Sequence, residues 1–192
     1  DTTVTIPAGN GILFFFRGSN VPGGNGSTAG TQLLQPLNFP DDVTLTQTGT
    51  LNTGPVTVRM WYGTPALGNN FSYTSFLVNA GTGPLNGGFA CVGNPYPSTI
   101  NWEKFNNTNA PGAITGGGGL PAKIWVYNDA SKQFESYMPA QGTDITSEHP
   151  AGSMATGTSA SNFIASGQAF FMQASGTGQT LTFNEAAKIS KQ

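Results

Sequence analysis

The hydrophobic residues of this chain occur in short runs separated by Gly, Pro and Asn, and the spacing typical of helices is almost absent. This pattern predicts an all-β sandwich or barrel, because turn residues at short intervals end each strand. Thr177–Phe183 alternates polar and apolar positions, so we expect one of its faces to be buried. The predicted strands are Thr2–Ile6, Gly11–Arg17, Val56–Tyr62, Phe71–Val78, Gly88–Val92, Lys123–Asn128, Gln133–Met138, Ala169–Ala174 and Gln179–Asn184.

A hairpin and a short helical turn can be placed within this series. Lys123–Tyr127 and Gln133–Tyr137 flank the turn-forming residues Asn128–Lys132, which predicts a β-hairpin. Ser98 is placed to cap a helical turn through Ile100–Phe105. Because so short a helix is marginal by itself, we expect its Trp and Phe side chains to dock onto the sheet.

Three segments are too rich in Gly or small polar residues to be expected in regular structure, namely Asn20–Thr31, Asn106–Pro121 and Gly142–Ser161. No change in composition marks a domain boundary. We therefore expect one antiparallel β-sandwich or jelly-roll-like domain over residues 1–192, with long Gly-rich loops and at most one or two short helical turns.

A weak internal repeat suggests that this domain has two similar halves. Ile6–Phe14 aligns with Ile164–Met172, and in both a Gly-containing corner leads into a Phe-rich strand. Thr-rich strands follow within Gly49–Val58 and Ser175–Phe183. A true repeat of this kind would place two similar sheets face to face.

The chain carries little charge. Only 8% of its residues are charged, against ~25% in an average globular domain, and the net charge is −2. This composition excludes the basic surface that nucleic acids or anionic membranes attract. The longest apolar run, Ile12–Phe16, is far shorter than the ~20 residues of a membrane-spanning helix, so we expect no membrane insertion. Because the chain begins at Asp1, we expect a processed form or an excised segment.

The residues of familiar catalytic sites are missing from the sequence. No nucleophile elbow, Walker loop or His-Glu-x-x-His motif occurs, and the single Cys91 and single His149 cannot form a His-rich or Cys-rich zinc site. Cys91 lies in an apolar run and is expected to be buried and inert. Asp41 and Asp42 are a weak calcium candidate. Candidate acids for an unrecognised hydrolase site are Glu103, Glu135, Asp144 and Glu148, with no pattern that selects a pair.

Aromatic residues offer a second possible surface, because exposed rings stack on the faces of sugars. Trp61 and Tyr62 are adjacent, and adjacent strand residues cannot both face one core. Tyr96 and Trp102, beside a Gly-rich loop, complete the candidate ligand-binding residues for surface glycans. Other strand aromatics, Trp125 and Tyr127 among them, more often face a core.

The scarcity of charge favours repeated contact between proteins. Soluble domains usually carry ~25–35% charged residues on their surface, whereas this surface must be mostly neutral and polar. Such surfaces have little like-charge repulsion, so we expect a homo-oligomer or polymer, with a monomeric module as the alternative. The N-terminal segment can add a strand to the sheet edge of a neighbouring copy. The candidate residues for this assembly strand are Thr2, Thr3, Val4, Thr5 and Ile6.

The most distinctive stretch is Gly93–Ser98, with the sequence Gly-Asn-Pro-Tyr-Pro-Ser. Pro95 and Pro97 fix φ and push Asn94 and Tyr96 into extended conformations, while the Asn side chain can bond local backbone. The stretch therefore predicts a sharp structural corner, with the cis or trans state of both prolines left open.

The chain resembles a module of large secreted surface proteins of Bacteroidota that carry this Gly-Asn-Pro-Tyr-Pro-Ser block, many of them exported by the type IX secretion system. Ile124–Tyr127, Ile164–Phe171 and Leu181–Ala186 are also similar to that family. The resemblance implies an extracellular or cell-surface location. Thr2, within Asp1-Thr2-Thr3, fits the O-glycosylation acceptor of this lineage.

The resemblance implies no reaction, so it assigns no catalytic residue. We therefore predict a non-enzymatic structural or adhesive module that self-associates as a subunit of a fibre, sheath or lattice, or serves as a spacer in a long adhesin. A carbohydrate-binding module that uses exposed Trp and Tyr is the alternative, and a hydrolase with an unrecognised site is the second alternative.

Overall fold

A computed structural model describes residues 8–11, 50–60, 62 and 88–189. The chain divides into two units, Asp1–Ile12 with Leu51–Gln192 and Leu13–Thr50, and every described strand belongs to the first. The predicted strands Thr2–Ile6 and Phe71–Val78, and all but the first residue of Gly11–Arg17, lie outside the described residues. The single domain expected over residues 1–192 stays a prediction.

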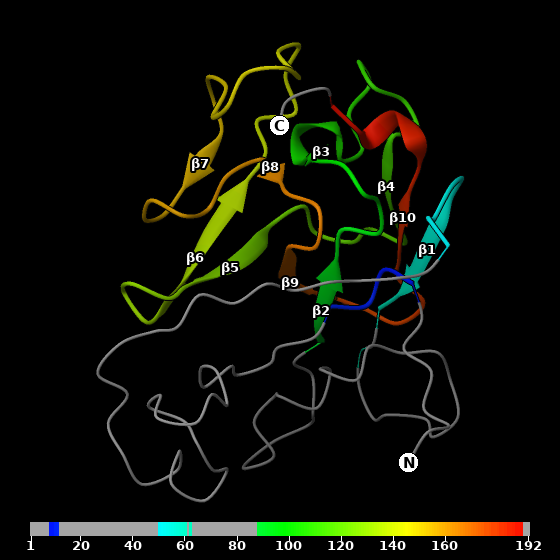
Figure 1. Cartoon of the computed structure of the whole chain (residues 1–192), viewed down its shortest axis with the longest axis horizontal. Coiled ribbons are helices and arrows are strands. Elements are labelled where there is room, and N and C mark those ends of the chain that lie inside the picture. Colours follow the sequence, from blue (N-terminus) through cyan, green and yellow to red (C-terminus); the bar gives the residue numbers. More distant parts are fainter. Residues whose placement is uncertain (1–7, 12–49, 61, 63–87, 190–192) are drawn as a thin grey trace, which may run out of the picture. The chain divides into compact units, whose positions relative to one another are not determined.

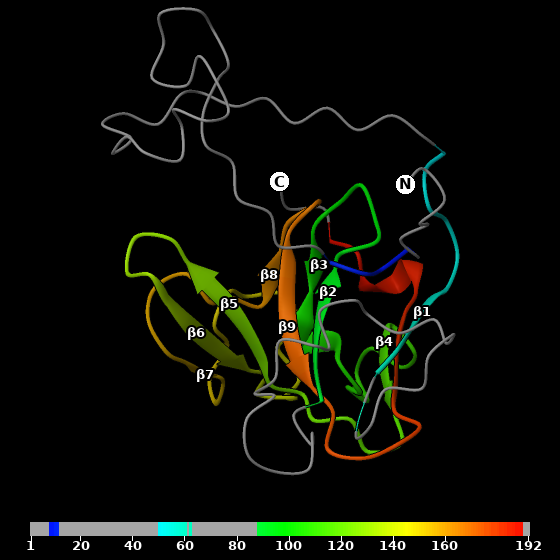
Figure 2. The ribbon, with the colours of Figure 1, turned by 90° about the horizontal axis from the view of Figure 1, so that it is seen from below.

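The strands form two main antiparallel sheets (Figures 1 and 2). The larger sheet has five strands in the order β2-β9-β5-β6-β7, and the smaller has three in the order β1-β10-β4. The strands of the larger sheet are β2 (Phe89–Gly93), β9 (Ala169–Gln173), β5 (Ile124–Asn128), β6 (Gln133–Met138) and β7 (Met154–Ala155). Those of the smaller sheet are β1 (Val56–Arg59), β10 (Thr180–Phe183) and β4 (Ile114–Gly117).

Shorter elements connect the sheets. β3 (Ile100–Asn101) pairs with β8 (Phe163–Ile164) in an antiparallel ladder, and two 3-10 turns, η2 (Trp102–Lys104) and η3 (Glu185–Ala187), are the helical elements of the described residues. Both are single turns, as the sequence predicts.

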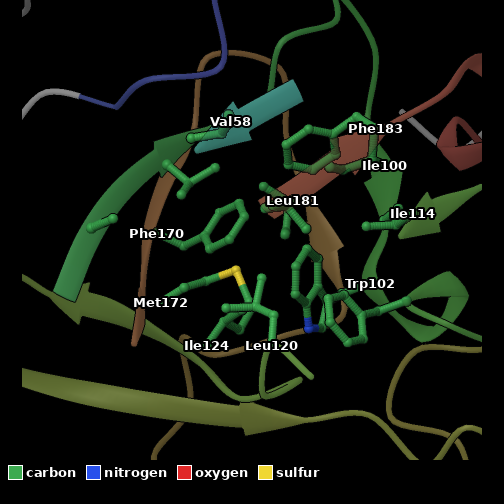
Figure 3. Packing of buried hydrophobic residues seen from close by; sticks show 14 of the residues in the cluster. Val58, Ile100, Trp102, Ile114, Leu120, Ile124, Phe170, Met172, Leu181 and Phe183 are labelled. Atoms are coloured by element: carbon green, nitrogen blue, oxygen red, sulfur yellow. The ribbon is translucent and has the colours of Figure 1, made fainter. Parts of the chain in front are cut away.

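One hydrophobic core lies between the two sheets. Phe170 and Met172 of β9 and Ile124 of β5 meet Leu181 and Phe183 of β10, as Figure 3 shows. Because both sheets contribute to one cluster, the all-β, antiparallel sandwich predicted from the alternation is confirmed. The fully buried side chains of largest volume are Trp102, Tyr96, Tyr137, Phe105, Phe170, Phe183, Ile100, Ile114, Ile124, Ile164, Met172 and Leu181.

The predicted hairpin is present as β5 and β6. Its register pairs Ile124 with Tyr137 and Tyr127 with Phe134. Asn128 Oδ1 accepts hydrogen bonds from the backbone N–H of Ala130 at 2.9 Å and of Ser131 at 3.2 Å, which closes the turn locally. Turn chemistry of this kind depends on neighbouring residues alone, so the sequence pattern was sufficient to place it.

The predicted helical turn is also present, but its cap was assigned to the wrong residue. Asn101, not Ser98, caps η2, because its side chain accepts a hydrogen bond of 2.9 Å from the Glu103 N–H. Trp102 docks as expected, with its ring centroid 5.0 Å from that of Phe105 and 5.1 Å from that of Phe170.

Two segments predicted to be loops contain strands. Gly142–Ser161 includes β7, and Asn106–Pro121 includes β4. In β4 the glycine is required by packing, since a Cβ on Gly116 would lie 2.3 Å from Cζ of Phe105. Glycine is a poor strand former by local propensity, and β4 forms through its four-residue antiparallel ladder with β10, which no local pattern indicates.

The described part of the first repeat copy and β9 of the second copy lie on opposite sides of β2. Asn10 bridges Val92 on one side of β2, and Ala169 pairs with Gly93 on the other. The Thr-rich strands that follow the two copies, β1 and β10, pair with each other. The described residues of both copies therefore flank the same strand, and whether the halves are true duplicates stays a prediction.

Candidate functional site

The aromatic residues predicted to bind ligands do not form an exposed platform. Tyr96 and Trp102 are 2% and 0% exposed, so their assignment to a sugar-binding surface is wrong. Their polar atoms are used internally, because the Tyr96 hydroxyl donates to the Gly54 carbonyl and Trp102 Nε1 donates to the Ala122 carbonyl, both at 2.7 Å. Tyr62 is partly buried against the core, and Trp61 lies outside the described residues.

The Gly-Asn-Pro-Tyr-Pro-Ser block is a structural corner, as its prolines predict. Asn94 Nδ2 lies 2.8 Å from the Ser98 carbonyl, 3.0 Å from that of Ile164 and 3.1 Å from that of Ala165. Its Oδ1 accepts a hydrogen bond of 3.0 Å from the Tyr96 N–H. One buried amide thereby joins the end of β2 to the end of β8, and no peptide bond among the described residues is cis.

Several other predicted sites fall outside the part that the structure describes. These are the calcium candidates Asp41 and Asp42, the assembly strand Thr2, Thr3, Val4, Thr5 and Ile6, and the glycosylation candidate Thr2. Within the described residues, no group of three or more His, Cys, Asp and Glu side chains is placed to hold a metal ion.

The larger sheet presents a row of aromatic side chains on the face that points away from the core. Ile124 and Val126 of β5 belong to the core, so Trp125 and Tyr127, which alternate with them, face the opposite way. Residues paired directly across antiparallel strands share a face, which adds Phe134 opposite Tyr127 and Phe171 opposite Trp125.

Phe89 of β2 completes this set, because its ring contacts that of Trp125 with centroids 5.3 Å apart. We call Phe89, Trp125, Tyr127, Phe134 and Phe171 the aromatic outer face. Phe134 lies within it between two other rings, at 5.3 Å from the centroids of both Tyr127 and Phe171. All three of these ring pairs are edge-to-face, the arrangement that aromatic quadrupoles favour.

Two of these rings are open to solvent. Tyr127 is 41% and Phe134 52% exposed, and both are among the exposed large hydrophobic residues of the described chain. Large apolar side chains grouped on one face, rather than scattered singly, mark sites of interaction. The aromatic outer face is therefore the candidate functional site.

The surroundings of the aromatic outer face are almost neutral. In the described strands, the neighbouring outward positions are held by uncharged residues such as Cys91, Ser136 and Gln173, and Lys123 contributes a cation 5.1 Å from the Trp125 ring centroid. In the turn beside Tyr127, Asp129 and Lys132 form an exposed ion pair of no net charge. Cys91 is buried as predicted, and this burial raises the pKa of its thiol to about 11. The thiol is thus protonated and a poor nucleophile at neutral pH.

The smaller sheet has a very different solvent face. Thr57, Thr182 and Thr115 lie in one row across β1, β10 and β4, and the hydroxyl oxygens of Thr57 and Thr182 are 2.9 Å apart. We call this row the threonine face. Because the threonine face meets solvent with polar groups, the apolar character of the aromatic outer face is a feature of one sheet and not of the sandwich in general.

The hydrolase candidate Glu103 is buried in η2 with no exposed surface. Its Oε1 accepts a hydrogen bond from the Tyr137 hydroxyl, and its Oε2 accepts one of 3.0 Å from the Ala140 N–H. The Gln141 N–H lies 3.3 Å from Oε2. This carboxylate therefore holds the chain that leaves β6.

Asparagine side chains continue this anchoring. Asn162 Nδ2 donates to Asn101 Oδ1 at 3.0 Å and to the Ser147 carbonyl at 2.9 Å, and Asn101 Nδ2 donates to the Ile145 carbonyl at 2.7 Å. Both amides are fully buried. These side-chain hydrogen bonds thus connect the segment after β6 to β3 and to the residue that precedes β8.

Glu135, a second hydrolase candidate, also binds a loop. Its Oε2 accepts a hydrogen bond of 2.5 Å from the Ser159 N–H, and its Oε1 accepts one of 2.6 Å from Asn128 Nδ2. The Asn128 amide and the Ser159 N–H lower the pKa of this carboxyl. A Cβ on Gly157, whose φ is +74°, would lie 2.0 Å from Cδ of Glu135, so the loop backbone closely encloses the acid.

The remaining carboxylates of the described chain are engaged in the same way. Asp144 accepts backbone N–H bonds from Thr146 and Ser147, which hold the pKa of its carboxyl well below the usual range, and Glu148 accepts a bond of 2.9 Å from the Ser161 hydroxyl. The other two, Asp129 and Glu185, form ion pairs with Lys132 and Lys188. Each described acid therefore has a partner within this chain.

Sequence reasoning named part of the aromatic outer face and missed the rest. The sequence names Trp125 and Tyr127 among the aromatic residues that can stack on sugars but favours a core position for such strand residues, whereas both face away from the core. Phe89, Phe134 and Phe171 are not among the predicted residues. The available signal was the pair Tyr127 and Phe134, which lie at matching positions on either side of the predicted hairpin turn. Phe171 joins them only through the pairing of β9 with β5.

Fold and site together define an antiparallel β-sandwich that presents an aromatic face on its larger sheet. The chain belongs to the family described as a domain of unknown function (DUF8693), which matches residues 28–192. Comparisons with curated proteins and with solved structures found no match. In the part of the chain that the structure describes, no helix combines the length and the hydropathy needed to cross a membrane.

Proposed function

We propose that this protein is a non-catalytic structural or adhesive module of a bacterial cell surface, and that it acts by self-association. The observation that carries the proposal is the aromatic outer face, with Tyr127 and Phe134 open to solvent on a nearly uncharged sheet. Aromatic residues are enriched and charged residues depleted at the centres of protein interfaces.

The state of the carboxylates supports a binding role over a hydrolytic one. Glu103 and Glu135 are buried and accept hydrogen bonds from loop backbone, so both acids serve to hold the fold. The extracellular location rests on the resemblance of the Gly93–Ser98 block to Bacteroidota surface proteins, and the low charge of the whole chain agrees with a role in repeated contacts.

Sedimentation velocity over a wide range of protein concentration tests the proposal. We expect the average sedimentation coefficient to rise with concentration, and electron microscopy of concentrated protein to show ordered assemblies. A coefficient that stays at the monomer value up to the highest attainable concentration would contradict self-association.

A carbohydrate-binding module is the second candidate function, favoured by the exposed ring of Tyr127 beside Trp125 and Lys123. A glycan array separates the two candidates. If the protein binds carbohydrate, we expect wild type to give a signal on the array. The Tyr127→Ala and Trp125→Ala variants should lose this signal while their circular dichroism spectra remain those of wild type. Under the first, no such signal is expected.

A further inference from the structure

We infer that the aromatic outer face is the surface through which this protein self-associates, and that its occupant is the same face of a second copy. The inference rests on the proposed function and adds to it the place and the symmetry of the contact. Four independent features of the described residues lead to it: charge, ring geometry, area and the position of Phe134.

The charge of the face suits a second copy. An isologous contact places each residue near its own symmetry mate or near the mate of a neighbour, so a charged face would repel itself. The aromatic outer face is flanked by uncharged Cys91, Ser136 and Gln173, and Lys123 lies at its edge. The turn between Tyr127 and Phe134 carries one charge of each sign, Asp129 and Lys132, which form an ion pair. Two such faces can therefore meet with little like-charge repulsion.

The geometry of the rings favours a protein partner over a sugar. Phe134 stands at 64° to Tyr127 and at 86° to Phe171, so the rings form ridges and hollows instead of a flat platform. A pyranose ring stacks on a flat, open ring face and needs polar groups around it. On β6, the hydroxyl of Ser136 is 8% exposed and already lies 3.2 Å from Oγ1 of Thr156. In the turn beside Tyr127, the exposed Asp129 and Lys132 are already paired with each other. Ridged rings instead fit between the rings of a like surface.

The area of the face predicts how strong the contact is. With 41% of Tyr127 and 52% of Phe134 exposed, these two rings offer roughly 200 Å², about a quarter of the ~800 Å² that each partner contributes to a standard interface. The remaining area must come from the polar residues around them. We therefore expect a reversible association that depends on concentration, and not a permanent dimer.

Phe134 is the residue on which the contact depends most. It is the more exposed of the two rings, and it touches both Tyr127 and Phe171. A side chain at the centre of an apolar patch becomes fully desolvated on association, and such residues carry most of the binding energy. Replacing Phe134 by a charged residue places two like charges in the contact.

The test uses charge substitution on the full chain. Phe134→Lys and Phe134→Glu are prepared as separate proteins, and Leu51→Lys is the control, because Leu51 is also an exposed large hydrophobic residue at 66% but lies outside the aromatic outer face. Each variant is first shown to be folded by circular dichroism and to unfold cooperatively. Association is then measured by sedimentation velocity.

We expect each Phe134 variant alone to associate roughly tenfold or more weakly than wild type, and Leu51→Lys to associate as wild type. An equal mixture of Phe134→Lys and Phe134→Glu should recover association, since opposite charges then meet across the contact. If a Phe134 variant does not fold, Tyr127→Lys and Tyr127→Glu replace it in the same comparison.

The outcomes separate the inference from the proposed function. If wild type associates and the Phe134 variants associate equally well, the inference is wrong, and self-association must use another surface. If each Phe134 variant alone associates more weakly than wild type and the mixture does not restore association, the contact is not between two copies of the same face. Wild type that stays monomeric and binds a glycan through Tyr127 overturns both.

Discussion

The hydroxyl of Tyr137 donates a hydrogen bond to Oε1 of Glu103, and neither side chain has any exposed surface. Tyr137 belongs to β6 and Glu103 to η2, so the bond joins the larger sheet to the turn that follows β3. The same carboxylate accepts N–H groups of Ala140 and Gln141. An acid that sequence reasoning placed among candidate catalytic groups is thus a central connection of the fold.

Tyr137→Phe is expected to destabilise the protein by about 1–3 kcal/mol, because the buried Glu103 carboxylate loses one of its donors. Urea denaturation followed by circular dichroism measures the change. Tyr127→Phe is the matched control, since the Tyr127 side chain is 41% exposed, and it should change the free energy of unfolding little. Equal values for the two variants would contradict the role given to the buried hydroxyl.

The same pair predicts a loss of stability at high pH. Burial, and then the hydrogen bond to Glu103, raise the pKa of Tyr137 above its ordinary value of 10.0. The folded state therefore retains the proton more strongly than the unfolded state, and the stabilisation is complete below pH ~10 and is lost as the pH rises beyond it. The alkaline decline in unfolding free energy should be shallower in Tyr137→Phe than in wild type.

Glu135 predicts the opposite dependence at low pH. Its pKa is lowered by hydrogen bonds from Asn128 and Ser159, so the folded state holds the charged form, and stability falls as the pH drops through the folded pKa. Glu135→Gln should flatten the acid limb of the curve of unfolding free energy against pH. Amide hydrogen exchange at Ser159 should quicken in the variant at neutral pH, and an unchanged rate would show that the carboxylate does not hold this loop.

Gly157→Ala tests how closely the loop encloses Glu135. The φ of Gly157 is +74°, and an added Cβ would lie 2.0 Å from Cδ of Glu135, so both backbone strain and a steric clash oppose alanine. We expect a loss of about 2 kcal/mol or more in the free energy of unfolding. Gly142→Ala is the control in the same segment, because an added Cβ there meets nothing within 4 Å. The two variants should differ clearly in thermal midpoint.

Asn94→Asp tests the corner at the end of β2. Aspartate keeps the acceptor for the Tyr96 N–H but faces the carbonyl oxygens of Ser98, Ile164 and Ala165 with an oxygen in place of the amide donor. We expect a loss of about 3 kcal/mol or more at neutral pH, since one oxygen of the buried carboxylate then faces three carbonyl oxygens and no donor. Asn109→Asp, at an exposed residue, should cost less than about 1 kcal/mol. Chemical denaturation of both variants provides the comparison.

The strands and the hairpin follow from the sequence because their signals are local. Alternation along Thr180–Phe183 and the turn residues after Asn128 act between neighbours in the chain, so the pattern alone determined the all-β class and the places of β5, β6, β9 and β10. The low charge likewise determined that few surface positions are ionised.

Only the tertiary structure decided which side chains meet. β4 forms in a Gly-rich segment because it pairs with β10, with Gly116 leaving room for the ring of Phe105. Glu103 is buried because it can bind Tyr137 and the chain after β6. The aromatic outer face exists because β9 pairs with both β2 and β5, which brings Phe171 beside the rings of Trp125 and Phe134. These are contacts between residues far apart in the chain, and no local propensity encodes them. The sequence pattern therefore determined the strands with local signals, and the packing determined β4, β7 and the site.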